Sequence, residues 1–275
     1  MLVYVSVDME GVAGVVHVDQ TRRNGHDYDR ARVWMTAETN AAIEGAFSAG
    51  ATSVLVNDSH GDMRNLELGQ LDRRAELISG SLKPLSMVQG ITRDAACALF
   101  VGYHAGAASQ AGILDHTYYG RVVAKLRVNG RDWNETAINA AVCGELGVPV
   151  VLVTGDQTCC AQAKEHLGDG VLTVQVKEAI TRYTARSLMP AVACEKIREG
   201  AAQAVRNAKS VKPFQPPPPF DLEIDFVQAA CADVAELVPG THRVSGATCS
   251  FRAPNAHVLL QVIQAWTILA GTTVV

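Results

Sequence analysis

The chain begins with Met1-Leu2-Val3-Tyr4-Val5-Ser6-Val7-Asp8-Met9-Glu10, an apolar run that ends in two carboxylates one residue apart. The run is typical of a short buried β-strand. Side chains two positions apart on a strand point to the same side, so Asp8 and Glu10 can converge at the carboxyl end of this strand. Open α/β sheets bind their ligands at that end. Two carboxylates placed there repel each other unless a cation or a shared proton lies between them, and we therefore expect a metal site.

Two later apolar runs each lead into a histidine. The run from Thr52 to Asp58 precedes His60, and the run from Ala98 to Tyr103 precedes His104. Carboxylate and neutral imidazole together form the ligand set of zinc, manganese or non-haem iron. The sequence contains no Cys-x-x-Cys pair, which argues against a closed structural zinc site.

The alternation of apolar strands with helical stretches predicts an α/β fold. We expect three layers, α/β/α, around a mixed and mostly parallel sheet, with a smaller C-terminal α+β portion. The expected helices cover residues 27–49, with Asp27 as the N-cap and Gly50 as the stop, 135–146, with Asn134 as the cap, and 188–209. The expected strands after the first cover residues 52–58, 98–103 and 148–154.

A proline-rich connection over residues 213–219 is the strongest boundary signal, because consecutive prolines cannot continue a helix and favour an extended spacer. It separates a predicted metal-binding α/β catalytic domain, residues 1–212, from residues 220–275. We expect this last block to form either a C-terminal subdomain or the edge of the sheet. Its predicted elements are a strand over 220–226, a helix, a strand over 243–252 and a final helix that begins near Pro254.

Composition predicts a cytoplasmic protein of ordinary solubility. The chain has 275 residues, 48% of them hydrophobic, and a net charge of -4, so nothing in its charge favours nucleic acid or an anionic membrane as a partner. Its start shows no secretory signal pattern, and its apolar runs are shorter than the roughly 20 residues needed to cross a bilayer. Seven cysteines at mostly apolar positions are typical of reduced, buried thiols rather than disulfides.

Five short motifs follow one another along the chain. They are Ser6-Val7-Asp8-Met9-Glu10-Gly11, Asn57-Asp58-Ser59-His60-Gly61, Gly102-Tyr103-His104-Ala105, Asp115-His116-Thr117 and Asn134-Glu135-Thr136. Each motif alone is weak, but together and in this order they resemble the zinc-dependent D-aminopeptidases of the DppA type, a family of dizinc peptidases. The resemblance runs from residue 1 to about residue 160, and a softer similarity continues to the C-terminus.

The resemblance implies a site that holds two zinc ions per chain. In this pattern Asp8 bridges the two ions, and His116 is the catalytic residue. The remaining implied ligands are Glu10, His60, His104 and Glu135. No sharp motif anchors the stretch between Tyr118 and Glu135, so Glu145 is a competing candidate for the last ligand.

The resemblance also implies an activity and an assembly. Members hydrolyse short peptides from the N-terminus, with a preference for D-amino acid residues such as D-alanyl peptides. They assemble into ring-shaped homo-oligomers that enclose the active sites, so we expect a ring here, with a decamer as a candidate size. Two alternatives stay open: another metal-dependent amidohydrolase or phosphoesterase, and a metal-binding sensor or transport accessory protein without turnover.

Several charged residues near the motifs have two interpretations. Asp58 could orient a ligand imidazole or cap a turn. The pair Lys177 and Glu178 could hold a substrate terminus or form a surface charge pair. We expect a solvated, turn-forming role for Asp62, Asp115 and Asp156, and a surface or structural role for His17, His26, His166, His242 and His257.

Overall fold

The computed structural model describes residues 1–274, and a seven-stranded sheet forms its centre. The strand order is β3-β2-β1-β4-β7-β8-β9. Every neighbouring pair is parallel except β8 and β9, which run antiparallel. The sheet is therefore mixed and mostly parallel, as the sequence predicted. Its strands are β1 (Leu2–Val7), β2 (Ser53–Asp58), β3 (Ala75–Ile78), β4 (Ala95–Val101), β7 (Val150–Asp156), β8 (Leu172–Thr181) and β9 (Thr184–Ser187).

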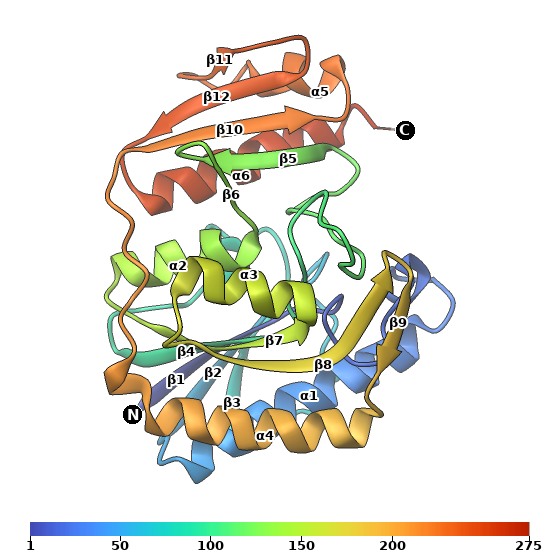
Figure 1. Ribbon diagram of the computed structural model, residues 1–275, viewed down its shortest axis with the longest axis vertical. Helices are drawn as coiled ribbons and strands as arrows, with labels where there is room; N and C mark the ends of the chain where they lie inside the picture. The colour runs from blue at the N-terminus through green and yellow to red at the C-terminus, as the bar shows by residue number, and fades with distance from the viewer. Residues whose placement is uncertain (275) are drawn as a thin grey trace.

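Helices cover both faces of this sheet. Figure 1 shows α1 (Tyr28–Ser48) and α4 (Pro190–Arg206) on one face, and α2 (Glu135–Glu145) and α3 (Gln157–Leu167) on the other. The predicted three-layer α/β/α arrangement is thus confirmed. Strands such as Val150–Asp156 are buried along their whole length, because helices exclude water from both faces. No helix in residues 1–274 is both long enough and apolar enough to span a membrane.

A second sheet of five strands lies beyond α2 and α3 (Figure 1). Its order is β11-β12-β10-β5-β6, and α5 (Ala229–Ala235) and α6 (Ala256–Gly271) accompany it. Three strands come from the C-terminal block: β10 (Phe220–Phe226), β11 (His242–Arg243) and β12 (Thr248–Ala253). The other two, β5 (Val123–Val128) and β6 (Arg131–Asp132), come from the first predicted domain. Residues 220–275 therefore do not build this sheet alone, and the domain division at residue 212 stays a prediction.

The proline-rich connection packs against the rest of the chain. Gln215 donates a hydrogen bond to the carbonyl oxygen of Gly144 at 2.7 Å. The rings of Phe214 and Trp133 lie 5.6 Å apart. The segment is therefore a packed connection between α4 and β10, and it passes the end of α2 on the way.

The structure corrects three local predictions. The strand predicted over 243–252 is two strands, β11 and β12, because the chain turns at residues 244–247. Asp27 stands at the N-cap position of α1, but it has a left-handed φ of 65° and its side chain makes no capping hydrogen bond. The helix predicted over 188–209 ends at Arg206, and a separate 3-10 turn follows at Ala208–Ser210.

The central position of β1 decides where the functional loops lie. Strand β2 pairs with β1 on one side and β4 pairs with it on the other. The order in which successive strands are added to the sheet therefore changes direction at β1. This is a topological switch point, where the loops beyond the strand ends diverge and leave a crevice. Asp8 follows β1 directly, while His60 and His104 follow β2 and β4. The two histidines therefore approach Asp8 from opposite sides.

Candidate metal centre

Five predicted ligands meet at the carboxyl ends of β1, β2 and β4. Asp8, Glu10, His60 and His104 come from the three strand ends, and Glu135 comes from the first turn of α2. All five are buried. Asn134 caps α2 by accepting a hydrogen bond from the Ala137 backbone N–H at 2.9 Å, as the sequence predicted. The helix N-terminus favours a carboxylate at this position.

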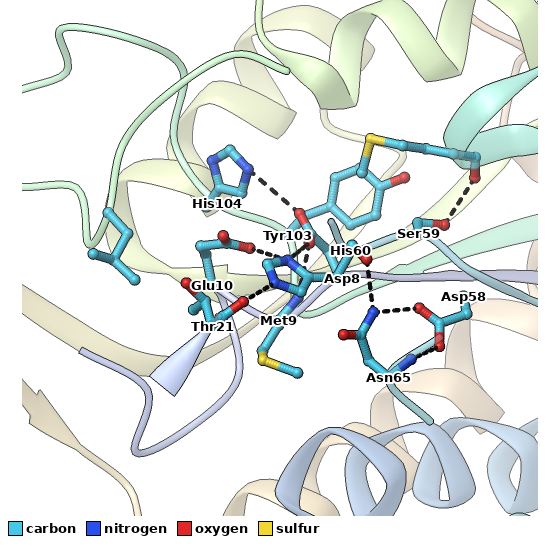
Figure 2. Close-up of polar contacts among 12 residues, drawn as sticks. Asp8, Met9, Glu10, Thr21, Asp58, Ser59, His60, Asn65, Tyr103 and His104 are labelled. Atoms are coloured by element: carbon cyan, nitrogen blue, oxygen red, sulfur yellow. Dashed lines mark hydrogen bonds and ion pairs between the residues drawn. The ribbon is translucent and has the colours of Figure 1, made fainter. Parts of the chain in front are cut away.

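The two carboxylate oxygens of Asp8 face different partners (Figure 2). Oδ1 lies 3.1 Å from Nδ1 of His60, and that nitrogen lies 2.9 Å from Oε2 of Glu10. Oδ2 lies 3.3 Å from Nε2 of His104, and that nitrogen lies 3.4 Å from Oε1 of Glu135. Asp8 therefore stands between two histidine–glutamate pairs, with one oxygen directed to each.

Backbone carbonyls fix which ring nitrogen of each histidine faces the site. Nε2 of His60 lies 2.7 Å from the carbonyl oxygen of Thr21, and Nδ1 of His104 lies 2.9 Å from that of Ala105. A carbonyl only accepts hydrogen bonds, so each of these nitrogens carries the proton. The opposite nitrogen of each ring therefore faces the carboxylates, and once its proton is displaced it offers the lone pair that a metal ligand needs.

Two buried atoms at the centre lack a hydrogen bond. They are Oε2 of Glu10 and Nε2 of His104, each with almost no accessible surface. Glu10 Oε2 is close to His60, but the geometry there is that of an ion pair without a hydrogen bond. Buried polar atoms are normally hydrogen-bonded, and an unpartnered set of carboxylate oxygen and imidazole nitrogen is what a metal ion completes. The residues present therefore fit a zinc site.

Burial makes the charges at this centre strongly dependent on one another. Burial and the negative charge of Glu10 raise the pKa of Asp8 to about 7. Burial disfavours the charged form of His104, but Glu135 and Asp8 outweigh burial and raise the pKa of His104 to about 10. A metal that binds here must displace protons from such imidazoles, so binding weakens as the pH falls.

His116 lies at the same centre, between His104 and the cavity. The two rings stack with their centroids 4.0 Å apart and their planes 9° from parallel. Nδ1 of His116 donates to the carbonyl oxygen of Leu114 at 2.8 Å, and Nε2 lies 3.9 Å from Oε1 of Glu135. Burial and the neighbouring His104 lower the pKa of His116, which favours a neutral ring with a free lone pair on Nε2.

The site opens into a cavity of about 750 Å³. Asp8, Glu10, His60, His116 and Glu135 all line it. Its walls also carry apolar side chains and several cations, among them Val18, Met63, Leu82, Met87, Ile268, Arg22, Lys83 and Arg182. Pockets for small molecules typically measure about 300–1,000 Å³, so the cavity accommodates a small substrate next to the five residues.

The sequence of the chain as a whole matches known peptidases. The profile of the peptidase family M55, described as D-aminopeptidase, matches residues 1–265. The chain belongs to the D-aminopeptidase family. A curated D-aminopeptidase of Bacillus subtilis is 41% identical over 278 residues, which cover 99% of each chain. A solved structure, the Zn-dependent D-aminopeptidase DppA from Bacillus subtilis, a self-compartmentalizing protease, superposes with a TM-score of 0.95 at 38% identity and covers 98% of each chain.

Membership of the D-aminopeptidase family confirms the resemblance that the five motifs carried. It does not test the role of each residue, so the assignment of ligands and of His116 stays a prediction. The histidines that we placed outside the site, His17, His26, His166, His242 and His257, do not line the cavity.

The structure distinguishes between the alternatives left open for Asp58 and Lys177. The Asp58 carboxylate accepts hydrogen bonds from the Asn65 side chain at 2.8 Å and the Leu66 backbone N–H at 2.8 Å, so it caps a turn. Lys177 is buried and bonds to backbone carbonyls, whereas the carboxylate of Glu178 pairs with Arg186 at the surface. The interpretation of Lys177 and Glu178 as a surface charge pair is therefore wrong.

Three carboxylates were expected to be solvated and to form turns, but Asp115 and Asp156 are buried, so for these two the expected solvation is wrong. Asp156 caps α3 by accepting from the Cys159 backbone N–H at 2.8 Å. Asp115 accepts from the Ser109 backbone N–H at 3.0 Å and also pairs with Arg182. Asp62 pairs with Arg64 at the surface.

Sequence reasoning missed the carbonyl of Thr21, and it named Lys177 without its contact to the loop after β1. A backbone carbonyl carries no side-chain signature, so no motif could have identified Thr21. Lys177 lies within β8, directly after Val176, and a lysine inside a strand was the one available signal.

The two candidates for the last ligand lie at opposite ends of α2. At about 1.5 Å per residue their backbones are roughly 15 Å apart. Glu145 is exposed, and it accepts a hydrogen bond from the His257 backbone N–H at 3.1 Å. Only Glu135 lies at the centre.

Glu135→Gln should therefore lower the metal content of the purified protein, while Glu145→Gln should leave it unchanged. The amide keeps the shape of the side chain but removes the negative charge that favours a cation. We expect zinc affinity to fall by more than about tenfold, the lower end of what the loss of a supporting residue costs. Elemental analysis after dialysis measures this. Loss of metal from the Glu145 variant alone would show that the wrong carboxylate was matched.

Proposed function

We propose that this protein is a zinc-dependent aminopeptidase that removes the N-terminal residue from short peptides, with a preference for D-amino acid residues such as D-alanyl peptides. The observation that carries the proposal is the position of Asp8, whose two oxygens each face one histidine–glutamate pair. The close similarity to Zn-dependent D-aminopeptidases over the whole chain supports it.

Two zinc ions per chain fit this centre better than one. A single catalytic zinc takes three protein ligands, and five candidates are present here. Asp8 would be shared by both ions, Glu10 and His60 would hold one of them, and His104 and Glu135 would hold the other. Three buried carboxylates carry a total charge of -3 when all are ionised, so one divalent cation leaves negative charge uncompensated, whereas two offset it in full.

Zinc, when bound, polarises the scissile carbonyl, lowers the pKa of a bound water to about 7 and anchors the free amino terminus of the substrate. His116 supplies the group that the metal ligands do not. Its Nδ1–H is held by the Leu114 carbonyl, so Nε2 faces the cavity with a lone pair. This nitrogen takes up or delivers a proton, or attacks the carbonyl, at neutral pH.

The size of the cavity supports a short peptide as the substrate. At about 750 Å³ it lies within the range of small-molecule sites. Its apolar side chains suit small residues such as alanine, and its arginines suit a free carboxyl terminus. The preference for D-residues rests on the similarity to D-aminopeptidases, since the ligand positions are independent of substrate chirality.

We also propose a ring-shaped homo-oligomer, with a decamer as its size, in the cytoplasm. The similarity to a self-compartmentalizing protease supports an assembly that encloses the cavity. Large exposed apolar side chains on the β8–β9 hairpin and the start of α4, namely Ile180, Tyr183, Met189 and Val192, suit burial between chains. Seven free cysteines, six of them buried, suit a reducing compartment.

The first test combines metal analysis with a chirality assay. We expect about two zinc ions per chain, and faster release of alanine from D-Ala-D-Ala than from L-Ala-L-Ala. Chelation should abolish release, and added zinc should restore it. Phosphate esters serve as control substrates for a phosphoesterase. A fully active preparation with at most one metal per chain would contradict the shared role of Asp8, and zinc without peptide hydrolysis would favour a sensor or accessory protein.

The second test concerns His116. His116→Ala should keep both zinc ions and the folded state, while turnover falls by about a hundredfold or more, because a group that moves protons at the reacting carbonyl is lost. Elemental analysis and steady-state kinetics measure the two effects. His257→Ala, on the surface of α6, is the matched control and should retain normal turnover. Loss of one zinc ion would make His116 a ligand, since its ring lies within reach of a metal also held by His104 and Glu135.

A further inference from the structure

Lys177 is a buried cation that the proposed mechanism does not use. It lies on β8, and only 2% of its surface is exposed. Its ammonium group donates hydrogen bonds to the carbonyl oxygens of Val12 at 2.8 Å and Val15 at 2.7 Å, and to the carbonyl oxygen of Glu10. All three acceptors belong to the loop that follows β1 and carries Glu10.

The number of donors matches the number of acceptors. An ammonium has three N–H donors and no acceptor, and three carbonyls within six residues converge on it. Carbonyl oxygens that point at one buried spot repel each other unless a positive charge lies between them. Lys177 therefore fills the position that a bound cation would take, and it does so as a charge attached to β8.

The position of the Glu10 carboxylate depends on how the backbone of this loop is held. Its Oε2 accepts no hydrogen bond, and its close polar neighbour is His60. The carbonyl of Glu10 points to Lys177, while the next N–H, of Gly11, donates to the carbonyl of Gly102 at 2.8 Å. A Cβ on Gly11 would lie 1.9 Å from the Tyr103 carbonyl oxygen, so the loop also packs tightly against the residues that follow β4.

Two other elements hold the same loop. Glu38 of α1 accepts from the Ala13 backbone N–H at 2.8 Å, and Ser187 of β9 accepts from the Gly14 N–H at 2.9 Å. These contacts satisfy N–H groups, whereas Lys177 donates to the inward carbonyls of Glu10, Val12 and Val15. The Val12 carbonyl also accepts a hydrogen bond from the Val15 backbone N–H at 3.2 Å. Without the ammonium, the buried carbonyls of Glu10 and Val15 lose the hydrogen bond that it donates, and the Val12 carbonyl keeps only its bond within the loop.

We propose that Lys177 is a positioning residue that fixes Glu10 at the metal centre by acting as a tethered cation for the carbonyls of Glu10, Val12 and Val15. The metal half of this proposal rests on the proposed function, in which Glu10 and His60 hold one of two zinc ions. His104 and Glu135, which would hold the other zinc ion, lie outside this loop. Loss of Lys177 therefore weakens one zinc position and spares the other.

The test compares Lys177→Met with Lys196→Met, which makes the same change on the exposed face of α4. Zinc titration of the metal-free proteins should show one of the two ions bound about 10–100-fold more weakly in Lys177→Met, and both unchanged in Lys196→Met. Cobalt(II) in place of zinc provides a spectroscopic readout, in which the absorption of one cobalt position should change. A folded Lys177→Met protein that binds both ions with wild-type affinity would overturn the proposal.

Hydrogen exchange of the metal-free proteins separates this proposal from the proposed function. The amides of residues 10–16 should exchange faster in Lys177→Met than in the wild type, whether or not the wild type binds two zinc ions. If the wild-type protein binds fewer than two zinc ions, the proposed dizinc site is wrong. Faster exchange of this loop in the variant would still support the role of Lys177 in the loop. Unchanged exchange would overturn that role.

Lys177→Ala keeps the proposal testable if the methionine variant does not fold. Removing the side chain beyond Cβ leaves room for n-propylammonium, which replaces the missing carbons and the charge. Added n-propylammonium should restore the second zinc ion and the wild-type cobalt spectrum, while n-propanol, which lacks the charge, should not. Equal rescue by both compounds would show that the lysine serves only to fill space in the core, and rescue by neither would overturn the role of its charge.

Discussion

The repulsion among three buried carboxylates is the constraint on which this structure depends. Asp8, Glu10 and Glu135 are all buried within one crevice, together with two histidines whose ring nitrogens face them. Burial alone strongly disfavours such charges, and the neighbouring negative charges add to the cost. The arrangement is stable only with positive charge at its centre, supplied by protons on the imidazoles or by metal ions.

The topology of the sheet brings these groups together without long connections. Because β1 lies between β2 and β4, the residues after all three strands reach the same crevice from different sides. Glu135 lies in the first turn of α2, which packs on the sheet face opposite α1 and α4, and Asn134 caps this helix. The carbonyls of Thr21 and Ala105 then fix the two imidazole rings. The rigid backbone thus holds the two ring nitrogens in place before any metal binds, which reduces the cost of ordering the site.

The sequence predicted the parts of this centre that follow apolar strands. Asp8, His60 and His104 each come directly after such a run, and parallel strands place their ends at one edge. Glu135 was accessible only through the family resemblance, because the chain passes through β5 and β6 of the second sheet before it returns. The sequence did not predict that β5 belongs to the second sheet. Strand β5 has the sequence Val-Ala-Lys-Leu-Arg-Val, and its half-exposed pattern does not indicate pairing with the distant strand β10. Long-range pairing of this kind has no local signal.

The central claim is that Asp8 lies between two zinc positions, and anomalous X-ray diffraction tests it most directly. Crystals of the zinc-loaded protein would be measured on both sides of the zinc absorption edge, and the difference map would locate each zinc ion. The account predicts two peaks, one on each side of the Asp8 carboxylate. One should lie beside His60 and Glu10, and the other beside His104 and Glu135. A single peak, or two peaks that do not share Asp8, would contradict it.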